Sequence, residues 1–319
     1  MPLPTVNDVR VVDPIMTNLS LGFRNKEFFY DRIFPPVPVN QASGTFFIWT
    51  RDYWFRRPVG GVRAESGPYN RVGFGVGSDT YSTLEYGWEY ALDEVTAKKS
   101  QTPESLDVLA AQYLSNIMQL ELEKQAAAAG FVTSVWGTTT TLTTTDQWSD
   151  YDASDPIANA DTAKRTIRRN TGDEPNMMFV GAITWEKLKE HPLILDKYKH
   201  TQTGILTEAL VAAALGIDQL VVGKSVENTA VEKAPGTASF TGADIWGDSA
   251  LFLKVTPSPG LMVPNGGYRY IWDEKGNVPW AMENYLEPQT RSTIHRIFSH
   301  WAYKITGAQY GYIYLDTNA

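Results

Sequence analysis

The chain has 319 residues, of which 43% are hydrophobic and 20% charged, and its formal net charge is −8. It contains no cysteine, which excludes disulfides, thiolate metal sites and cysteine nucleophiles. The acidic balance argues against tight gripping of nucleic acid, because that mode requires clustered Lys and Arg. No stretch approaches the roughly 18 to 20 apolar residues of a membrane span, and the amino terminus lacks the pattern of a secretory signal. We therefore expect a soluble protein that is made and kept inside a cell.

The first 43 residues have the composition of an extended arm. They contain six prolines, three of them within Pro35-Pro36-Val37-Pro38. Proline fixes its own φ and removes a backbone donor, so this segment cannot sustain long helices. We expect an extended N-terminal arm over residues 1–43.

Residues 44–96 have the pattern of a long two-stranded ribbon. Aromatic and β-branched runs at 46–49 and 81–90 flank a centre, residues 58–68, that is rich in glycine, proline and other turn formers. An isolated two-stranded ribbon is only marginally stable in water. The ribbon therefore needs another surface to lie on, and a neighbouring subunit is the natural candidate.

A long helix is expected over residues 103–129. Thr102 can cap it, Pro103 suits its first position, and Gly130 provides a stop. At 1.5 Å per residue this helix would span roughly 40 Å. Apolar residues recur along it at helical spacing, namely Leu106, Leu109, Tyr113, Ile117 and Leu120.

Shorter elements follow in the second half of the chain. Seven threonines within residues 138–145 favour a strand or loop over a helix. A second helix is expected from Asp155-Pro156 to Asn170, stopped near Gly172. Beyond it we expect strands at 177–180, 219–222 and 251–255, helices at 184–190 and 206–215, and strand patterns again over 291–315.

Three short motifs suggest chemistry, but each lacks an essential part. The stretch 216–225 ends in Gly-Lys-Ser, yet Asp218 stands where a phosphate loop needs glycine. The glycines at 73, 75 and 77 have the wrong spacing for a dinucleotide site, and no helix follows them. The stretch 247–251 contains Ser249 within Gly-Asp-Ser, but neither a base nor an oxyanion hole can be identified.

Histidines and carboxylates form no evident site either. The histidines at 191, 200, 295 and 300 do not have the spacing of two ligands on one helix face. Acidic pairs such as Asp93-Glu94 and Asp273-Glu274 carry no mark of a catalytic pair. We expect no catalytic residue, no cofactor and no metal, and therefore an assembly protein rather than an enzyme.

Two groups of residues carry a resemblance to a known family. The arm holds Val12-Asp13-Pro14, Asn18-Leu19-Ser20 and Pro35-Pro36-Val37-Pro38. The central group consists of Asp155-Pro156-Ile157-Ala158, Thr171-Gly172, Pro175-Asn176, Trp185, Leu188, His191-Pro192, Ile194-Leu195-Asp196, Thr201-Gln202 and Gly204. Together with the order of arm, ribbon, long helix and mixed segment, these strings resemble the major capsid proteins of tailed bacteriophages.

The resemblance implies an α+β chain with the Hong Kong 97-type capsid fold. That fold has an N-arm, an extended β-hairpin loop, a peripheral domain with a long spine helix, and an axial domain. The corresponding boundaries are 1–43 for the arm, 44–96 for the extended loop, 97–172 for the peripheral domain with spine helix 103–129, 173–290 for the axial domain, and 291–319 for strands returning to the peripheral domain.

The resemblance also implies a function and a set of partners. Copies would form pentamers and hexamers of an icosahedral head in the virion, after assembly in the host cytoplasm, and would enclose double-stranded DNA without binding a specific sequence. Head-to-tail interfaces would join the copies. Because only about 43 residues precede the ribbon, we expect a separate scaffolding protein, and a portal protein and a decoration protein are further expected partners. No membrane is involved.

Two expectations concern the extended loop. Residues 44–96 contain no lysine, so the lysine-based isopeptide links known from the type member of the fold are not expected. The loop arginines are expected to pair with acidic groups on the long helix of a neighbour. The residues in this prediction are Arg51, Arg56, Arg57, Arg63 and Arg71 on the loop and Glu104, Asp107, Glu121 and Glu123 on the helix.

Two alternatives remain open at this point. One is an encapsulin-type compartment of the same fold that encloses cargo enzymes, although Pro2 and Pro4 disfavour the amino-terminal helix of those shells. The other is a soluble hydrolase with Ser249 as nucleophile. The content of purified particles, DNA or a cargo enzyme, would distinguish a phage head from an encapsulin-type compartment. A small oligomer in size-exclusion chromatography would instead indicate the hydrolase.

Overall fold

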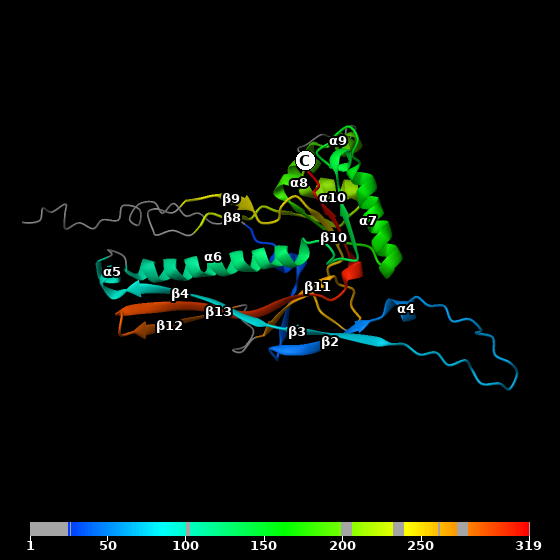
Figure 1. Cartoon of the computed structure of the whole chain (residues 1–319), viewed down its shortest axis with the longest axis horizontal. Coiled ribbons are helices and arrows are strands. Elements are labelled where there is room, and N and C mark those ends of the chain that lie inside the picture. The colour runs from blue at the N-terminus through cyan, green and yellow to red at the C-terminus, as the bar shows by residue number, and fades with distance from the viewer. Residues whose placement is uncertain are drawn as a thin grey trace, which may run out of the picture.

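The structure is a computed structural model, and it describes residues 25, 27–99, 103–198, 206–231, 239–260, 262–272 and 280–318. Within these residues the chain forms two five-stranded sheets with a long helix between them, and a ribbon that projects from one end (Figure 1). Several sequence-based expectations lie outside the described residues. They concern residues 1–24, Thr102, His200, Thr201, Gln202, Gly204, Asp273 and Glu274.

The long helix is confirmed as α6, which spans Pro103–Gly130. One stripe of it is buried, formed by Leu114, Met118, Leu122 and Ala126 at intervals of four residues. This stripe belongs to one core cluster with Ile297 and residues from both sheets. The helix is therefore held by tertiary packing along its inner face. The apolar residues from which the sequence predicted the helix lie outside this stripe, and two of them, Leu109 and Tyr113, are exposed.

The first sheet lies against α6 and is organised around its longest strand, β13 (Ser292–Ile305). One edge of β13 pairs antiparallel with β4 (Leu84–Asp93). The other edge pairs first with β12 (Ala281–Glu287) and then with β11 (Gly267–Trp272), so these two strands lie end to end. β1 (Pro36–Val39) completes the sheet beside β11 in parallel orientation.

The paired ribbon is shorter than the segment 44–96 expected from the sequence. Its strands are β2 (Ser43–Trp49) and β3 (Val76–Ser82), which pair in antiparallel register. β4 instead joins the first sheet, because its alternate aromatic residues pack under α6. Tyr86, for example, stacks on Trp301 of β13 with ring centroids 4.2 Å apart.

The second sheet has the order β5, β14, β10, β6, β7. Four of its strands, all except the edge strand β5, are buried and alternate between the two core clusters. In β10, for instance, Phe252 faces one core cluster while Leu251 and Leu253 face the other. The strands are β5 (Thr138–Thr141), β14 (Gly311–Leu315), β10 (Ala250–Leu253), β6 (Met177–Gly181) and β7 (Gln219–Gly223).

Helices cover the outer face of the second sheet, while the far side faces α6 (Figure 1). The outer helices are α7 (Pro156–Thr171), α8 (Ala182–Glu190), α9 (Pro192–Tyr198) and α10 (Glu208–Leu215). The sequence predicted α7, α8 and α10 closely, but it did not predict α9. The last strand also differs from expectation. β14 pairs with β5 and β10 in this second sheet, whereas only β13 of the 291–319 segment returns to the first.

The predicted ends of α7 are confirmed in atomic detail. The Asp155 carboxylate accepts hydrogen bonds from the backbone N–H groups of Ile157 and Ala158 at 3.0 and 2.9 Å. Gly172 closes the helix with φ of 75°, a conformation that disfavours other residues. Both ends of this helix are therefore set by local sequence.

The remaining elements are short. They are α3 (Tyr30–Ile33), α4 (Arg51–Trp54), α5 (Glu94–Lys99), β8 (Val226–Asn228), β9 (Gly242–Asp244) and the 3-10 turns η1 (Thr144–Asp146) and η2 (Ala308–Tyr310). In the part of the chain that the structure describes, no helix combines the length and apolar character needed to cross a membrane.

Candidate functional site

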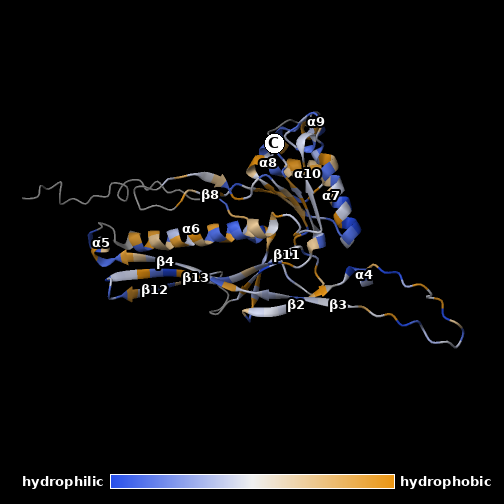
Figure 2. Ribbon diagram, in the orientation of Figure 1, coloured by the Kyte–Doolittle hydropathy of each residue, from blue (hydrophilic) through white to orange (hydrophobic). Residues whose placement is uncertain are grey.

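The ribbon exposes an unusual amount of apolar surface. Phe47 is 71% exposed, and Val59 and Val62 near the tip are 99% and 94% exposed. Figure 2 shows hydrophobic positions scattered along the whole projecting loop. So many large exposed apolar side chains on one projecting loop make it a candidate interaction surface. The other large exposed side chains of the ribbon are Ile48, Tyr53, Trp54, Phe55, Tyr69, Val72, Phe74 and Val76.

The base of the ribbon is anchored to the first sheet by aromatic stacking. The Tyr270 ring of β11 stacks on Tyr81 of β3 at 4.6 Å between centroids, and on Phe46 of β2 at 5.7 Å. Lys304 of β13 lies 3.9 Å from Asp79 of β3. These contacts fix where the ribbon leaves the body, while its tip stays exposed.

A second anchor joins the ribbon to the ends of α7 and η2. Arg51 donates hydrogen bonds to the side-chain oxygens of Asn170 and Gln309 at 3.3 and 3.2 Å. The Phe55 ring lies over Gly172, where a Cβ atom would come within 3.1 Å of it. The ribbon thus touches both halves of the body near its root.

The five arginines predicted to contact a neighbour fall into two groups. Arg51 donates hydrogen bonds to Asn170 and Gln309 of its own chain. Arg63 donates to the Gly67 carbonyl at 2.6 Å and stacks over the Tyr69 ring. Arg56, Arg57 and Arg71 are exposed. The three that can most readily reach another copy are therefore Arg56, Arg57 and Arg71.

The acidic residues predicted to contact a neighbour differ in how far their side chains are exposed. The side chain of Asp107 is 56% exposed. Glu121 is partly buried and accepts from Gln125 at 2.6 Å. The side chain of Glu104 lies outside the described residues. Glu123 is 0% exposed, so it faces the core and not a neighbour.

Glu123 instead joins three segments that are distant in sequence. One carboxylate oxygen accepts from the backbone N–H groups of Phe29 and Tyr30 at 2.8 and 2.9 Å. The other accepts from the Trp246 indole at 2.7 Å and from the Ser225 hydroxyl at 3.0 Å. Burial raises the pKa of Glu123 above its ordinary value, while the four hydrogen bonds act in the opposite direction. Its role is to hold the end of the arm against α6.

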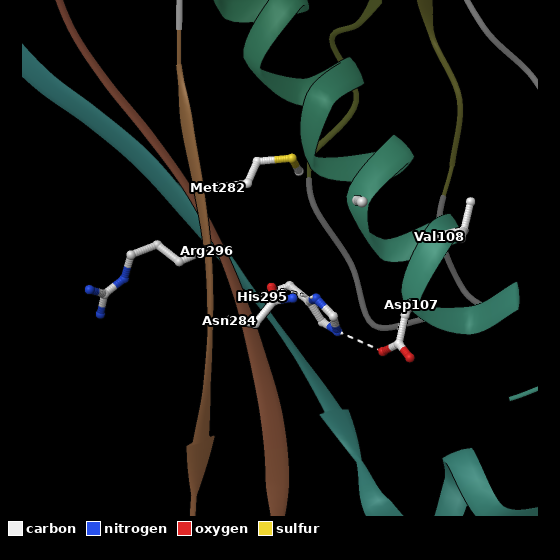
Figure 3. Close-up of a pocket in the computed structure, with 7 residues that line it drawn as sticks. Asp107, Val108, Met282, Asn284, His295 and Arg296 are labelled. Atoms are coloured by element: carbon white, nitrogen blue, oxygen red, sulfur yellow. Dashed lines mark hydrogen bonds and ion pairs between the residues drawn. The ribbon is translucent and has the colours of Figure 1, made fainter. Parts of the chain in front are cut away.

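The outer end of α6 and β12 encloses a shallow depression of about 250 Å³ (Figure 3). His295 of β13 lies at its floor, with Nδ1 2.9 Å from the Asn284 Oδ1 and Nε2 3.0 Å from the Asp107 Oδ1. Val108 and Met282, both largely exposed, form apolar walls. The depression therefore combines an accessible carboxylate with apolar sides.

Within the described part of the chain, none of the hydrogen bonds of His191, His295 and His300 involves Ser249. His191 is fully buried, with Nε2 3.1 Å from the Ser154 hydroxyl, and Leu193 N–H donates to its Nδ1 at 3.3 Å. His300 packs edge-on against Trp272. Among the described residues, no group of three or more His, Cys, Asp or Glu side chains could hold a metal ion.

The stretch that resembled a phosphate loop is ordinary strand structure. Residues 219–223 form β7, and Gly216 is the left-handed cap of α10. Gly223 is required by packing, since a Cβ atom there would lie 2.2 Å from the Trp246 ring. Lys224 pairs with Glu208 at 2.8 Å. The backbone N–H groups of Gly216, Ile217 and Gln219 already donate to carbonyl oxygens within the chain.

Comparison with known proteins gives a consistent result. No protein-family model matches the chain. The major capsid protein of Burkholderia phage BcepMu is 28% identical over 321 residues, covering 98% of this chain and 99% of the relative. A crystal structure of a phage-related protein from Bordetella bronchiseptica RB50 superposes with a TM-score of 0.69 at 23% identity, covering 97% and 98% of the two chains. The capsid structure of cyanophage P-SCSP1u gives a TM-score of 0.59 at 9% identity, covering 94% and 91%.

Proposed function

We propose that this chain, which has the fold of phage capsid proteins and is similar over almost its whole length to a bacteriophage major capsid protein, is itself a major capsid protein. Its copies assemble as pentamers and hexamers into an icosahedral head that encloses double-stranded DNA. The observation that carries the proposal is the ribbon, whose apolar tip stays exposed in the single chain. Ordered side chains of this size are stabilised when a partner removes them from water. A neighbouring copy of the same chain is that partner.

The proposed ring contact is head-to-tail. The ribbon of one copy lies across the body of the next, so that one surface meets a different surface. The tip, residues 50–75, carries five arginines against Asp52 and Glu65, a net charge of +3. The outer half of the body, which we define as residues 84–109 and 281–298, carries eight acidic against four basic residues, a net charge of −4. The opposite charges favour this orientation.

The domain roles follow the same proposal. Residues 1–43 act as the N-arm and the β2–β3 ribbon as the extended loop. The first sheet with α6 is the proposed peripheral domain, and the second sheet with its outer helices is the proposed axial domain. This division changes the bounds expected from the sequence, because β5 and α7 leave the 97–172 segment for the axial domain, and β11 and β12 leave the 173–290 segment for the peripheral domain. A separate scaffolding protein, a portal protein and a decoration protein are the proposed partners during assembly in the host cytoplasm. The chain acts as a structural protein of the virion, without a catalytic site.

Microscopy of purified particles tests the proposal directly. The chain would be produced with and without the proteins encoded beside it, and the void fraction of a sizing column would be examined by negative stain. Shells with pentameric and hexameric units that protect double-stranded DNA from nuclease support the proposal. Particles filled with a cargo enzyme would instead indicate an encapsulin-type compartment, and a small soluble oligomer under all conditions would refute assembly.

Denaturing gels of the same particles test the absence of crosslinks. Because residues 44–96 contain no lysine, the ribbon cannot supply the lysine of an isopeptide bond. We expect boiled particles to run as a single band at the mass of one chain. A covalent ladder of this chain would contradict the expectation.

A further inference from the structure

The Glu123 carboxylate is shared between two segments that lie far apart in the sequence. Its Oε2 accepts from the backbone N–H groups of Phe29 and Tyr30, at the end of the arm. Its Oε1 accepts from the Trp246 indole and the Ser225 hydroxyl, which flank the β8–β9 hairpin. One side chain of α6 therefore holds the arm with one oxygen and the root of the hairpin with the other.

The arm and the hairpin also contact each other directly. The Asn25 side chain donates to the Val226 carbonyl at 3.0 Å, and the Val226 N–H donates to the Asn25 amide oxygen at 3.1 Å. The next residue, Glu227, forms an ion pair with Lys124 of α6. Three consecutive residues, 225–227, are thus bound to α6 or to the arm.

The hairpin has few contacts of its own to stabilise this root. β8 and β9 pair over three residues each. So short a two-stranded ribbon is marginally stable in water. Beyond the paired residues, Val231 and Phe240 are 79% and 75% exposed and add little burial. The order of the root therefore depends on the contacts with α6 and the arm.

The arm is anchored on its other side by different contacts. Arg269 of β11 pairs with Asp31 at 2.7 Å and lies over the Tyr30 ring. The Arg269 N–H also donates to the Pro35 carbonyl at 3.1 Å. Loosening at Glu123 can therefore open one end of the arm while these contacts with the first sheet keep the other end in place.

The burial of the Glu123 carboxylate makes the four hydrogen bonds depend on one another. The side chain is fully buried, and burial raises its pKa because the charged form loses the stabilisation of water. The four donors together offset this cost. If the two N–H groups of the arm leave, the carboxylate is buried with half of its donors, which strongly destabilises it. It then gains by turning toward water, and its other oxygen withdraws from Trp246 and Ser225.

We propose that Glu123 couples the arm to the β8–β9 hairpin, so that displacing either segment from α6 loosens the other. The coupling is reciprocal, because one carboxylate mediates it in both directions. A partner that takes up the arm therefore frees the root of the hairpin, and a partner that takes up the hairpin frees the arm. The inference goes beyond the proposed function, since the coupling exists within one folded chain.

Hydrogen exchange of the isolated full-length chain, resolved to single amides by fragmentation mass spectrometry, tests the coupling. Trp246→Phe keeps an aromatic ring but removes the indole donor to Oε1 of Glu123. The amides of Phe29 and Tyr30 bond the other oxygen and are not bonded to Trp246. They should nevertheless exchange about tenfold faster, the effect of losing one hydrogen bond to a charged group.

Trp301→Phe is the matched control. Its indole also donates to a side chain of α6, that of Gln125 at 2.8 Å, and not to Glu123. The variant therefore removes an indole hydrogen bond of the same kind from the same helix. The Phe29 and Tyr30 amides should exchange in it at wild-type rates.

Two further variants keep the inference testable if Trp246→Phe fails to fold. Ser225→Ala removes the second donor to Oε1 and should accelerate exchange of the two arm amides about threefold. Asp31→Asn weakens the anchor of the arm on Arg269 and tests the reverse direction. Its reporter is the Ile245 amide, which donates to the Ser225 carbonyl at the root of the hairpin and should exchange about threefold faster.

Each outcome decides for or against the coupling. Faster exchange of the two arm amides in the hairpin-side variants, with faster exchange of the hairpin amide in the arm-side variant, supports it. Wild-type rates at the arm amides in both hairpin-side variants would overturn it. Equal acceleration in the control would overturn it too, because the loss of any indole hydrogen bond would then suffice. The particle microscopy tests the proposed function separately, since these exchange rates do not depend on assembly.

Discussion

The ribbon and the second sheet contain similar residues but place them in opposite surroundings. In the second sheet, Phe252 and Tyr314 pack edge to face and are almost completely buried within one chain. In the ribbon, Phe47 and Phe74 remain largely exposed. The sheet is stabilised by its own helices, whereas the ribbon leaves its large side chains in water. The body therefore folds on contacts within one chain, and the following experiments test this difference between the body and the ribbon.

The largest expected effect comes from truncating the buried aromatic core. Phe252→Ala removes a fully buried ring and should lower the free energy of unfolding of the single chain by about 3–5 kcal/mol, measured by urea denaturation. Phe47→Ala is the matched ribbon variant and should change it by less than about 0.5 kcal/mol. Phe47→Ala should nevertheless weaken assembly. Equal losses of subunit stability for the two variants would break the comparison.

The next effect concerns the arm and Glu123. Glu123→Ala leaves the N–H groups of Phe29 and Tyr30 and the Trp246 indole without their acceptor. We expect a loss of about 2–4 kcal/mol in the free energy of unfolding, together with faster hydrogen exchange at residues 29–34. Glu121→Ala, two residues away and partly exposed, should cost less than about 0.5 kcal/mol. If both variants lost the same amount, the special role of Glu123 would be disproved.

A smaller effect is expected at the cap of α7. Asp155→Ala removes the acceptor for two backbone N–H groups and should cost about 1 kcal/mol, as other N-cap substitutions do. Asp161→Ala on the same helix removes only an exposed ion pair and should change stability by a few tenths of a kcal/mol. The difference between the urea midpoints of the two variants measures how much the Asp155 cap stabilises α7. Identical midpoints would count against the cap.

The smallest effect is a pH dependence from His191. Burial lowers the pKa of His191 below its ordinary value of 6.5, so protons bind the unfolded chain first as the pH falls. The contribution of neutral His191 to the free energy of unfolding is complete above about pH 6.5. It is lost as the pH drops toward the pKa of His191 in the folded chain. The urea midpoint of the wild type should fall between pH 7.5 and 5.5, and His191→Gln should reduce that fall. A wild-type midpoint unaffected by pH would contradict the prediction.

Local signals in the sequence predicted most of the body well. Pro103 and Gly130 mark the ends of α6, and Asp155 and Gly172 mark those of α7, because each terminus is decided by residues next to it. α9 was missed although Pro192 stands at its first position, as Pro103 does in α6. Its seven residues are too few to show an apolar repeat at helical spacing.

Contacts between distant segments could not be predicted in the same way. In the sequence, Glu123 is one of several charged residues on α6, as Glu121 and Lys124 are. It is buried only because residues 29, 30, 225 and 246 approach it in the folded chain. One signal existed, since Glu123 stands four residues before the buried Ala127 and therefore shares its face of the helix. The split of the closing strands between two sheets likewise depends on tertiary pairing, which strand periodicity does not encode.

The pairing of β13 determines how the molecule carries mechanical load. The ribbon leaves the body roughly along the direction of β13, from contacts with Tyr270 and Lys304 (Figure 1). A pull on the ribbon therefore acts along the strands, and the ten residue pairs between β13 and β4 share it together. Hydrogen bonds loaded side by side must fail together, whereas bonds loaded at one end fail in turn. A load along the strands therefore engages all ten pairs of β13 and β4 at once, whereas a load across the edge strand β12 would engage its seven pairs with β13 in turn.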